Sequence, residues 1–259
     1  MPDTGAPRVR LVCFPHAGGS AAGYRAWAAA LAPAVEVVPA ELPGRDGRVR
    51  ETPLRDMDAL AADAADRLVG REGRHPPAYA FFGHSMGAVL AYETARELRR
   101  RARVPVLLVA SGSDPPHRVA EASRDRHLLP EPEFLREVLR LGGTSAHVLA
   151  EPELLRVLLP RLRADYAAAE TYAHRDGEPL ACPVTVYAGA ADPTVRPELL
   201  ADWARIRATP GEPVVVRRFP GGHFYLDDAR PYVLRAIAKD VHTALHTAAL
   251  RAPDRKETP

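Results

Sequence analysis

Short apolar segments recur along the chain, and polar residues seldom interrupt them. Six are rich in β-branched or aromatic residues: "VRLVCF" (9–14), "VEVVPA" (35–40), "AYAFF" (78–82), "VPVLLVAS" (104–111), "PVTVYAG" (183–189) and "PVVVRRF" (213–219). Strands buried on both faces have this pattern, which is typical of a parallel sheet covered by helices on both sides. We therefore predict that these segments form a mostly parallel sheet.

The segments between these strands carry apolar residues at helical spacing instead. Examples are "YRAWAAALA" (24–32), "LRDMDALAADAADRLVG" (54–70) and "MGAVLAYETARELRRR" (86–101). Alternation of strands with helices predicts an α/β doubly wound fold. A chain of 259 residues that is 46% hydrophobic can bury one substantial core, so we predict a single domain over residues 1–259.

One region breaks this alternation. Residues 117–175 contain no strand-like segment, only the helical patterns "PEPEFLREVLRLGG" (130–143) and "EPELLRVLLPRLRADYAAAETY" (151–172). We expect Gly142 and Gly143 to end the first helix and Pro160 to kink or split the second. A crossover this long predicts an inserted helical lid over residues 117–175, with the core at about 8–116 and 176–248. The polar N-terminus and residues 250–259 are expected to be disordered.

Charge and composition exclude several classes of function. Lys and Arg number 35 and Asp and Glu 33, and the net charge of +2 gives no general attraction to nucleic acid or to a membrane surface. No apolar run reaches the ~18 residues of a membrane span, and no signal peptide is recognisable, so we expect a cytoplasmic protein. Cys13 and Cys182 are expected to be buried free thiols, and no metal-ligand spacing is present.

The stretch "AFFGHSMGAVL" (80–90) contains a GxSxG motif centred on Ser85. A strand precedes it and a helix follows it, which is the setting of a nucleophile elbow. In such an elbow, side chains at Gly83 and Gly87 would collide with neighbouring backbone. The turn would present the Ser85 hydroxyl at the end of the strand and the Met86 N–H toward a developing oxyanion.

A serine hydroxyl needs a base and an orienting acid, which this arrangement places in the order Ser, Asp, His. His223, in "FPGGHFYL" after the last strand, is the candidate base. Asp192, in "VYAGAADPTV", is favoured as the acid because it follows the penultimate strand, and Asp114, in "LLVASGSDPP", stays open as the alternative. The other histidines are not favoured as bases. His242 and His246 are spaced for a metal but lack a third ligand, so a surface helix is the preferred interpretation.

A second glycine motif, "FPHAGGSAAGY" (14–24), follows the first strand. It lacks the spacing and the lysine of a nucleotide-binding loop. In a serine hydrolase such a loop supplies the second N–H of the oxyanion hole, and Ala17 is the candidate donor.

These motifs resemble the type II thioesterases that accompany modular polyketide synthases and nonribosomal peptide synthetases. The resemblance extends from "LVCFPHAGGSA" through "LPGRDGR", "FGHSMGA", "FLREVLRLGGT" and "LPRLRADYAAAETY" to "YAGAADPTV" and "FPGGHFYL". It implies an α/β-hydrolase fold with a helical lid, Ser85, His223 and Asp192 as catalytic residues, and Ala17 and Met86 as oxyanion donors. Synthase-fused relatives often carry the acid after the earlier strand, and "SDPP" around Asp114 departs from the usual family sequence.

The resemblance also implies a function. Such enzymes release acyl groups from the phosphopantetheine arm of acyl or peptidyl carrier proteins and so clear stalled or wrongly loaded synthases. We expect a monomer that needs no cofactor of its own. The alternatives are a thioesterase that releases one pathway product, a small-molecule carboxylesterase, and a non-catalytic acyl-binding or scaffold protein.

Overall fold

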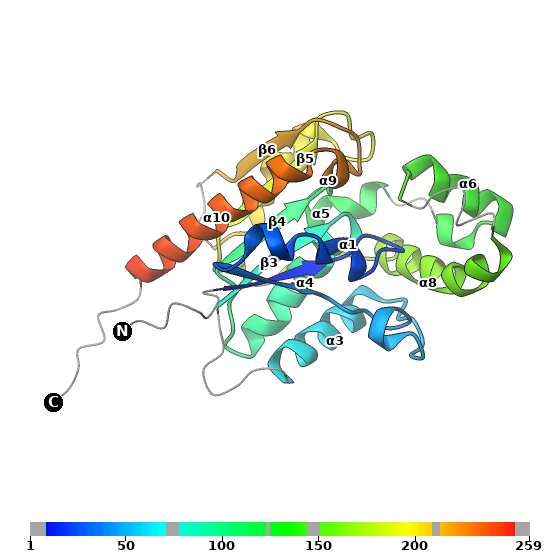
Figure 1. Cartoon of the computed structure of the whole chain (residues 1–259), viewed down its shortest axis with the longest axis horizontal. Coiled ribbons are helices and arrows are strands. Elements are labelled where there is room, and N and C mark those ends of the chain that lie inside the picture. The colour runs from blue at the N-terminus through cyan, green and yellow to red at the C-terminus, as the bar shows by residue number, and fades with distance from the viewer. Residues whose placement is uncertain (1–8, 71–77, 123–124, 144–150, 209–212, 252–259) are drawn as a thin grey trace.

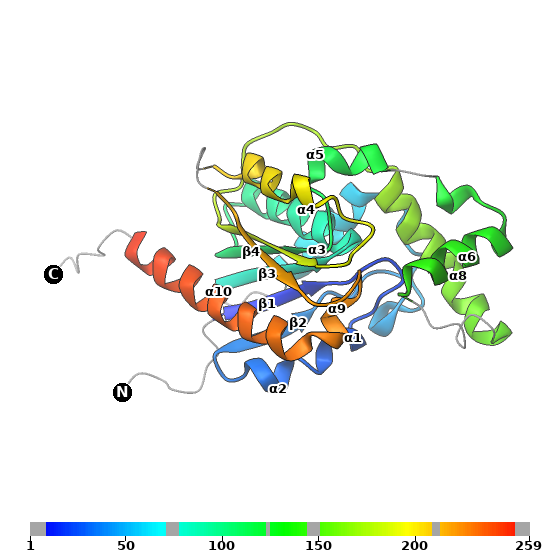
Figure 2. The same ribbon diagram turned by 90° about the horizontal axis from the view of Figure 1, so that it is seen from above.

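The computed structural model describes residues 9–70, 78–122, 125–143, 151–208 and 213–251 of the chain. Its described strands form one six-stranded sheet in the order β2-β1-β3-β4-β5-β6, and every pair is parallel (Figures 1 and 2). The strands are β1 (Val9–Phe14), β2 (Val35–Pro39), β3 (Ala78–His84), β4 (Leu107–Ser111), β5 (Val184–Gly189) and β6 (Val215–Phe219). The α/β doubly wound fold that the alternating pattern predicts is therefore confirmed.

The central strand β3 shows why these segments are continuously apolar. Successive side chains of a strand face opposite sides of the sheet. Tyr79 and Phe81 join the core that includes α3 and α4, whereas Ala80 and Phe82 join the core on the opposite face. Both phenylalanines are fully buried. Edge strand β6 differs, because most of its residues are exposed or half-buried and two of them are arginines.

Helices cover both faces of the sheet (Figure 2). One face carries α3 (Met57–Gly70), α4 (Met86–Arg100) and the 3-10 helix η4 (Pro197–Ile206). The other face carries α1 (Ala22–Arg25), α2 (Ala28–Leu31), α9 (Tyr225–Asp228) and α10 (Arg230–Arg251). The helical pattern over 24–32 is thus divided into two short helices, and a further short helix, η1 (Asp46–Arg48), follows β2.

Apart from an isolated β-bridge between Leu180 and Arg207, the regular elements described in the long crossover between β4 and β5 are all helices. They are α5 (Pro116–Val119), η2 (Ala120–Ala122), η3 (Arg126–Leu128), α6 (Glu131–Leu141) and α8 (Pro152–Glu170). Helices α6 and α8 lie together at one end of the sheet, opposite the end toward which α10 extends (Figures 1 and 2). Helix α6 ends as expected at Gly142, whose φ of 83° is in the left-handed region that favours glycine.

Pro160 does not split α8, contrary to one of the two outcomes expected for it. The helix runs from Pro152 to Glu170 without interruption. Proline removes one N–H and leaves the carbonyl of Arg156, four residues earlier, without its helical partner. Pro160 and Arg156 are both exposed, so water can bind that carbonyl and the helix continues.

Several smaller expectations can be compared with the described residues. Cys13 and Cys182 are buried free thiols, as predicted. Helix α10 continues to Arg251, past the point where a tail over 250–259 is predicted. The rest of that tail and residues 1–7 lie outside the described residues. Within the described part of the chain, no helix combines the length and apolar character needed to cross a membrane.

Candidate active site

Ser85 occupies the sharp turn between β3 and α4. Strand β3 ends at His84 and α4 begins at Met86. The Ser85 backbone has φ 56° and ψ −121°, a conformation that is costly for a residue with a side chain. Its N–H donates a hydrogen bond of 2.8 Å to the Ser111 carbonyl at the end of β4. The strand, turn and helix that the GxSxG motif predicts are therefore present.

Backbone packing around this turn leaves room only for glycine. A Cβ atom at Gly83 would lie 1.9 Å from the carbonyl oxygen of Gly87. A Cβ atom at Gly87 would lie 2.2 Å from the carbonyl oxygen of Phe14, at the end of β1. Since both distances are far shorter than a van der Waals contact, the glycines allow β1, β3 and α4 to meet backbone to backbone.

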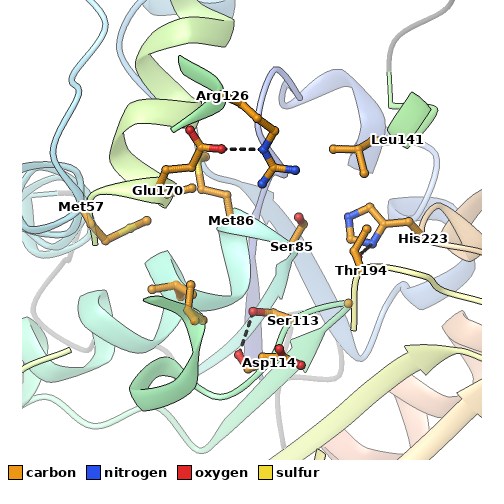
Figure 3. Close-up of a pocket in the computed structure, with 14 residues that line it drawn as sticks. Met57, Ser85, Met86, Ser113, Asp114, Arg126, Leu141, Glu170, Thr194 and His223 are labelled. Atoms are coloured by element: carbon orange, nitrogen blue, oxygen red, sulfur yellow. Dashed lines mark hydrogen bonds and ion pairs between the residues drawn. The ribbon is translucent and has the colours of Figure 1, made fainter. Parts of the chain in front are cut away.

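His223 and Asp192 meet at the same end of the sheet. His223 lies between β6 and α9, and its Nδ1 is 2.8 Å from Oδ2 of Asp192, which follows β5. The other carboxylate oxygen accepts hydrogen bonds from the N–H and the hydroxyl of Thr194, at 2.9 and 2.7 Å. Because Nδ1 faces the carboxylate, Nε2 is the ring nitrogen left on the side of Ser85 (Figure 3).

The surroundings of Asp192 favour its charged form. Burial by itself would raise the pKa of this carboxyl group. The hydrogen bond and charge of His223 and the two hydrogen bonds from Thr194 outweigh burial, so the pKa of Asp192 lies below its ordinary value of 3.8. Asp192 therefore presents a carboxylate to the imidazole at neutral pH.

Asp114, the alternative acid, is engaged elsewhere. Its two carboxylate oxygens accept hydrogen bonds from the Arg196 N–H at 3.0 Å and from Nε of Arg196 at 2.7 Å. Arg196 follows β5, so this ion pair joins the loops after β4 and β5. The structure thus brings Asp192, and not Asp114, into contact with His223.

The two N–H groups predicted to form the oxyanion hole belong to Ala17, in the loop after β1, and to Met86, the residue after Ser85. The loop after β1 turns tightly at Ala17, where the Gly19 N–H donates to the His16 carbonyl at 2.9 Å. Within the described residues, the N–H groups of Ala17 and Met86 donate to no protein acceptor. Met86 is the first residue of α4, so its N–H also lies at the positive end of the helix dipole.

The two histidines of the glycine motifs are poor candidates for a base. His84 is fully buried, and its Nδ1 lies 2.9 Å from the Ser111 hydroxyl, which shares a hydrogen bond of 2.5 Å with the Tyr225 hydroxyl. Burial lowers the pKa of His84 well below 6.5, and that of His16 to about 4. Both rings therefore take up a proton less readily than an ordinary histidine, which makes them poor general bases.

A cavity of about 150 Å³ opens beside Ser85 and His223 (Figure 3). Its apolar lining comes from α3, α4 and the segment between β4 and β5: Met57, Met86, Val89, Val119, Leu141 and Ala169. An ion pair also lines it, in which Nε of Arg126 donates to Glu170 at 2.6 Å. Arg126 and Glu170 both belong to the segment between β4 and β5.

A second ion pair joins α8 to the loop after β2, and both of its members bind the loop after β1. Arg45 donates to both oxygens of Asp165, at 2.6 and 2.8 Å, and both side chains are almost completely buried. Asp165 also accepts the Gly18 N–H at 2.7 Å, and Arg45 donates to the Gly19 carbonyl at 2.9 Å. The loop that carries Ala17 is therefore held from the side of α8.

No group of three or more histidine, cysteine or acidic side chains within the described ranges could hold a metal ion. His242 and His246 are exposed on α10, in agreement with the interpretation as a surface helix. His75 and His147 lie outside the described residues.

Comparison with known proteins identifies the family. The family model for the thioesterase domain matches residues 9–241, which is most of the chain. The chain belongs to the thioesterase domain family. This thioesterase is 45% identical to thioesterase PikA5 of Streptomyces venezuelae over 225 residues, covering 85% of this chain and 76% of that protein.

Solved structures of thioesterases have the same fold. The RedJ thioesterase from the prodiginine pathway of Streptomyces coelicolor is 40% identical, with a TM-score of 0.81 over 90% of this chain and 86% of that one. The type II thioesterase BorB from the borrelidin biosynthetic cluster is 37% identical, with a TM-score of 0.77 over 92% of each chain. The predicted resemblance to type II thioesterases and the α/β-hydrolase fold are confirmed, and this thioesterase is a serine hydrolase that acts on thioesters.

Sequence reasoning missed several residues of this thioesterase site. Thr194 stands two positions after Asp192, a spacing at which an aspartate commonly binds the backbone of its own loop, so this partner could have been found. Arg45 and Asp165 are 120 positions apart, and no local pattern connects them. Arg126 and its partner Glu170 likewise lack a local signal.

Proposed function

We propose that this thioesterase removes acyl groups from the phosphopantetheine arm of carrier proteins, and so clears stalled or wrongly loaded synthases. The observation that carries the proposal is the contact between His223 and Asp192 beside Ser85, at the mouth of an acyl-sized cavity. The names of similar proteins support the setting, since they come from the prodiginine and borrelidin pathways.

The proposed mechanism uses Ser85 as the nucleophile. His223 takes the Ser85 proton on Nε2 while Asp192 holds the imidazole by Nδ1 and stabilises the imidazolium that forms. The alkoxide attacks the thioester carbonyl, and the N–H groups of Ala17 and Met86 bind the developing oxyanion. The thiolate leaves, and a water activated by His223 then releases the free acid from Ser85.

The size of the cavity supports editing over release of a finished product. Pockets for drug-sized ligands enclose roughly 300–1,000 Å³. The cavity beside Ser85 has about 150 Å³, which suits a short acyl group better than a complete polyketide or peptide chain. In this proposal the segment 117–175 acts as a lid, because its helices supply one wall of the cavity.

Three variants test the residues of this mechanism with an acyl-carrier thioester as substrate. We expect Ser85→Ala to lower kcat on the order of 10⁶-fold, and Asp192→Asn on the order of 10⁴-fold because the histidine tautomer is then wrong. Asp114→Asn is the matched control and should change kcat by less than about 10-fold, since Asp114 contacts Arg196. Greater damage from Asp114→Asn than from Asp192→Asn would make our choice of acid wrong.

The substrate class needs a separate measurement. We expect kcat/KM to be highest for short acyl groups on a carrier protein, and lower for product-length thioesters and for simple esters of the same acids. Preference for a simple ester over the carrier thioester would favour a carboxylesterase instead. Failure of a serine-directed probe to label Ser85 would favour a non-catalytic protein.

A further inference from the structure

The acyl cavity contains an arginine whose two terminal nitrogens are not used by the protein. Nε of Arg126 donates to Glu170, and the guanidinium carbon lies 5.6 Å from the ring centre of Tyr166. Within the described residues, no protein acceptor lies within hydrogen-bond distance of Nη1 or Nη2 of Arg126. Figure 3 shows the guanidinium turned into the cavity that Ser85 and His223 also line.

The position of Arg126 is fixed by its neighbours. Glu170, the last residue of α8, receives Nε of Arg126 on one oxygen and both the N–H and Nδ1 of His127 on the other, at 3.0 and 2.8 Å. The Arg126 side chain is 20% exposed and the Glu170 side chain only 3%. The terminal N–H groups therefore stand at a defined place in the cavity, facing whatever enters it.

The chemistry of this arrangement favours an oxygen acceptor. Walls such as Met57, Val89 and Val119 suit an alkyl chain, but an alkyl chain beside Arg126 would remove water from N–H donors without replacing their hydrogen bonds. Because Glu170 already balances the arginine charge, a neutral carbonyl or hydroxyl oxygen is sufficient to satisfy these donors.

We propose that Arg126 selects acyl groups that carry an oxygen substituent, a ketone or hydroxyl, over unsubstituted alkyl groups of the same length. The inference rests on the proposed hydrolysis of acyl thioesters at Ser85 and specifies the acyl group. Arg126 thereby acts as a specificity-determining residue on the lid side of the cavity.

The test compares matched thioesters on one carrier protein: butanoyl with 3-oxobutanoyl, and hexanoyl with 5-oxohexanoyl. For each pair, the preference is the ratio of kcat/KM for the oxo group to kcat/KM for the alkyl group. We expect the wild-type enzyme to prefer the oxo member of at least one pair, and Arg126→Met to lower that preference about 10- to 100-fold. A general loss of folding or activity affects both members of a pair and leaves the preference unchanged.

The control is Arg156→Met, which removes an exposed arginine of the same lid whose ion-pair partner among the described residues is the exposed Glu153, and should leave both preferences unchanged. Arg126→Lys retains one cationic donor and should give an intermediate preference; it decides the test if Arg126→Met does not fold. Preferences that stay at the wild-type value in the Arg126 variant, or a wild type that prefers neither oxo group, would overturn the inference. Absence of wild-type hydrolysis of all four thioesters would instead overturn the proposed function.

Discussion

The two sides of the cavity beside Ser85 are held in place by different contacts. On the sheet side, Gly83 and Gly87 bring backbone against backbone, with no space for even one added carbon atom. On the lid side, two charged pairs, Arg45 with Asp165 and Arg126 with Glu170, attach the helices through side chains. Ser85 thus belongs to a support packed backbone against backbone, whereas the opposite wall is attached through side chains, which include the apolar side chains of α8 as well as the charged pairs.

The two kinds of contact should respond differently to substitution. Backbone packing tolerates no substitution, which keeps the strained Ser85 conformation fixed whatever the substrate. A buried ion pair adds little net stability, because desolvation of the charges offsets much of their attraction, yet removing one partner is costly. Replacing both members of a lid-side pair should therefore cost less stability than removing one of them.

Gly83→Ala should have the largest effect, because it adds a carbon atom on the tightly packed side. The new Cβ would collide with the carbonyl of Gly87, and neither backbone can move without displacing Ser85. We expect a loss of about 4 kcal/mol or more in the free energy of unfolding, measured with urea, or no soluble protein. Gly70→Ala is the control, since a Cβ there meets no atom of the described residues within 4 Å. Normal stability and normal labelling of Ser85 in Gly83→Ala would refute the backbone argument.

Asp165→Asn should have the next largest effect, because it leaves the Arg45 charge buried without its partner. Removing one member of a buried pair costs about 3–5 kcal/mol, and we expect a loss of that size in urea unfolding. Glu153→Gln is the control, because Glu153 and Arg156 are both exposed and such pairs contribute at most about 1 kcal/mol.

The double variant Arg45→Met with Asp165→Leu then separates stability from positioning. Replacing a buried pair with apolar side chains is often neutral, so the double variant should recover much of the lost stability. It does not restore the acceptor for the Gly18 N–H. We therefore expect kcat to remain reduced in the double variant, and full recovery of kcat would show that Asp165 does not position the loop of Ala17.

The same comparison explains what the sequence could predict. Strands, helices and the turn at Ser85 follow from patterns within about twenty residues, and the glycines on either side of Ser85 mark the tightly packed side directly. Arg45 is separated from Asp165 by 120 positions, and Arg126 from Glu170 by 44 positions. Nothing in the local sequence matches the two members of either pair. Of the two outcomes expected at Pro160, the split was wrong for a related reason, because whether proline interrupts a helix depends on access of water to the freed carbonyl.

Acid should weaken the sheet side through His16, with the smallest effect among these predictions. His16, in the loop after β1, has a pKa lowered to about 4, first by burial and then by the nearby His223 and Arg45. A histidine whose pKa is lower in the folded than in the unfolded chain binds fewer protons when folded. Its contribution to stability is therefore complete above pH 6.5 and is lost as the pH falls from 6.5 toward 4.

Urea unfolding at pH 7 and pH 4.5 measures this contribution. His16→Gln should reduce the acid-induced loss in the free energy of unfolding by roughly 1–2 kcal/mol. This is less than the full difference between the folded and unfolded pKa values would give, because the ring is only half-buried. His246→Gln, an exposed position on α10, is the control and should leave the loss unchanged. If His16→Gln loses as much stability in acid as the wild type, the burial of a neutral ring at this loop does not limit the acid stability of the sheet side.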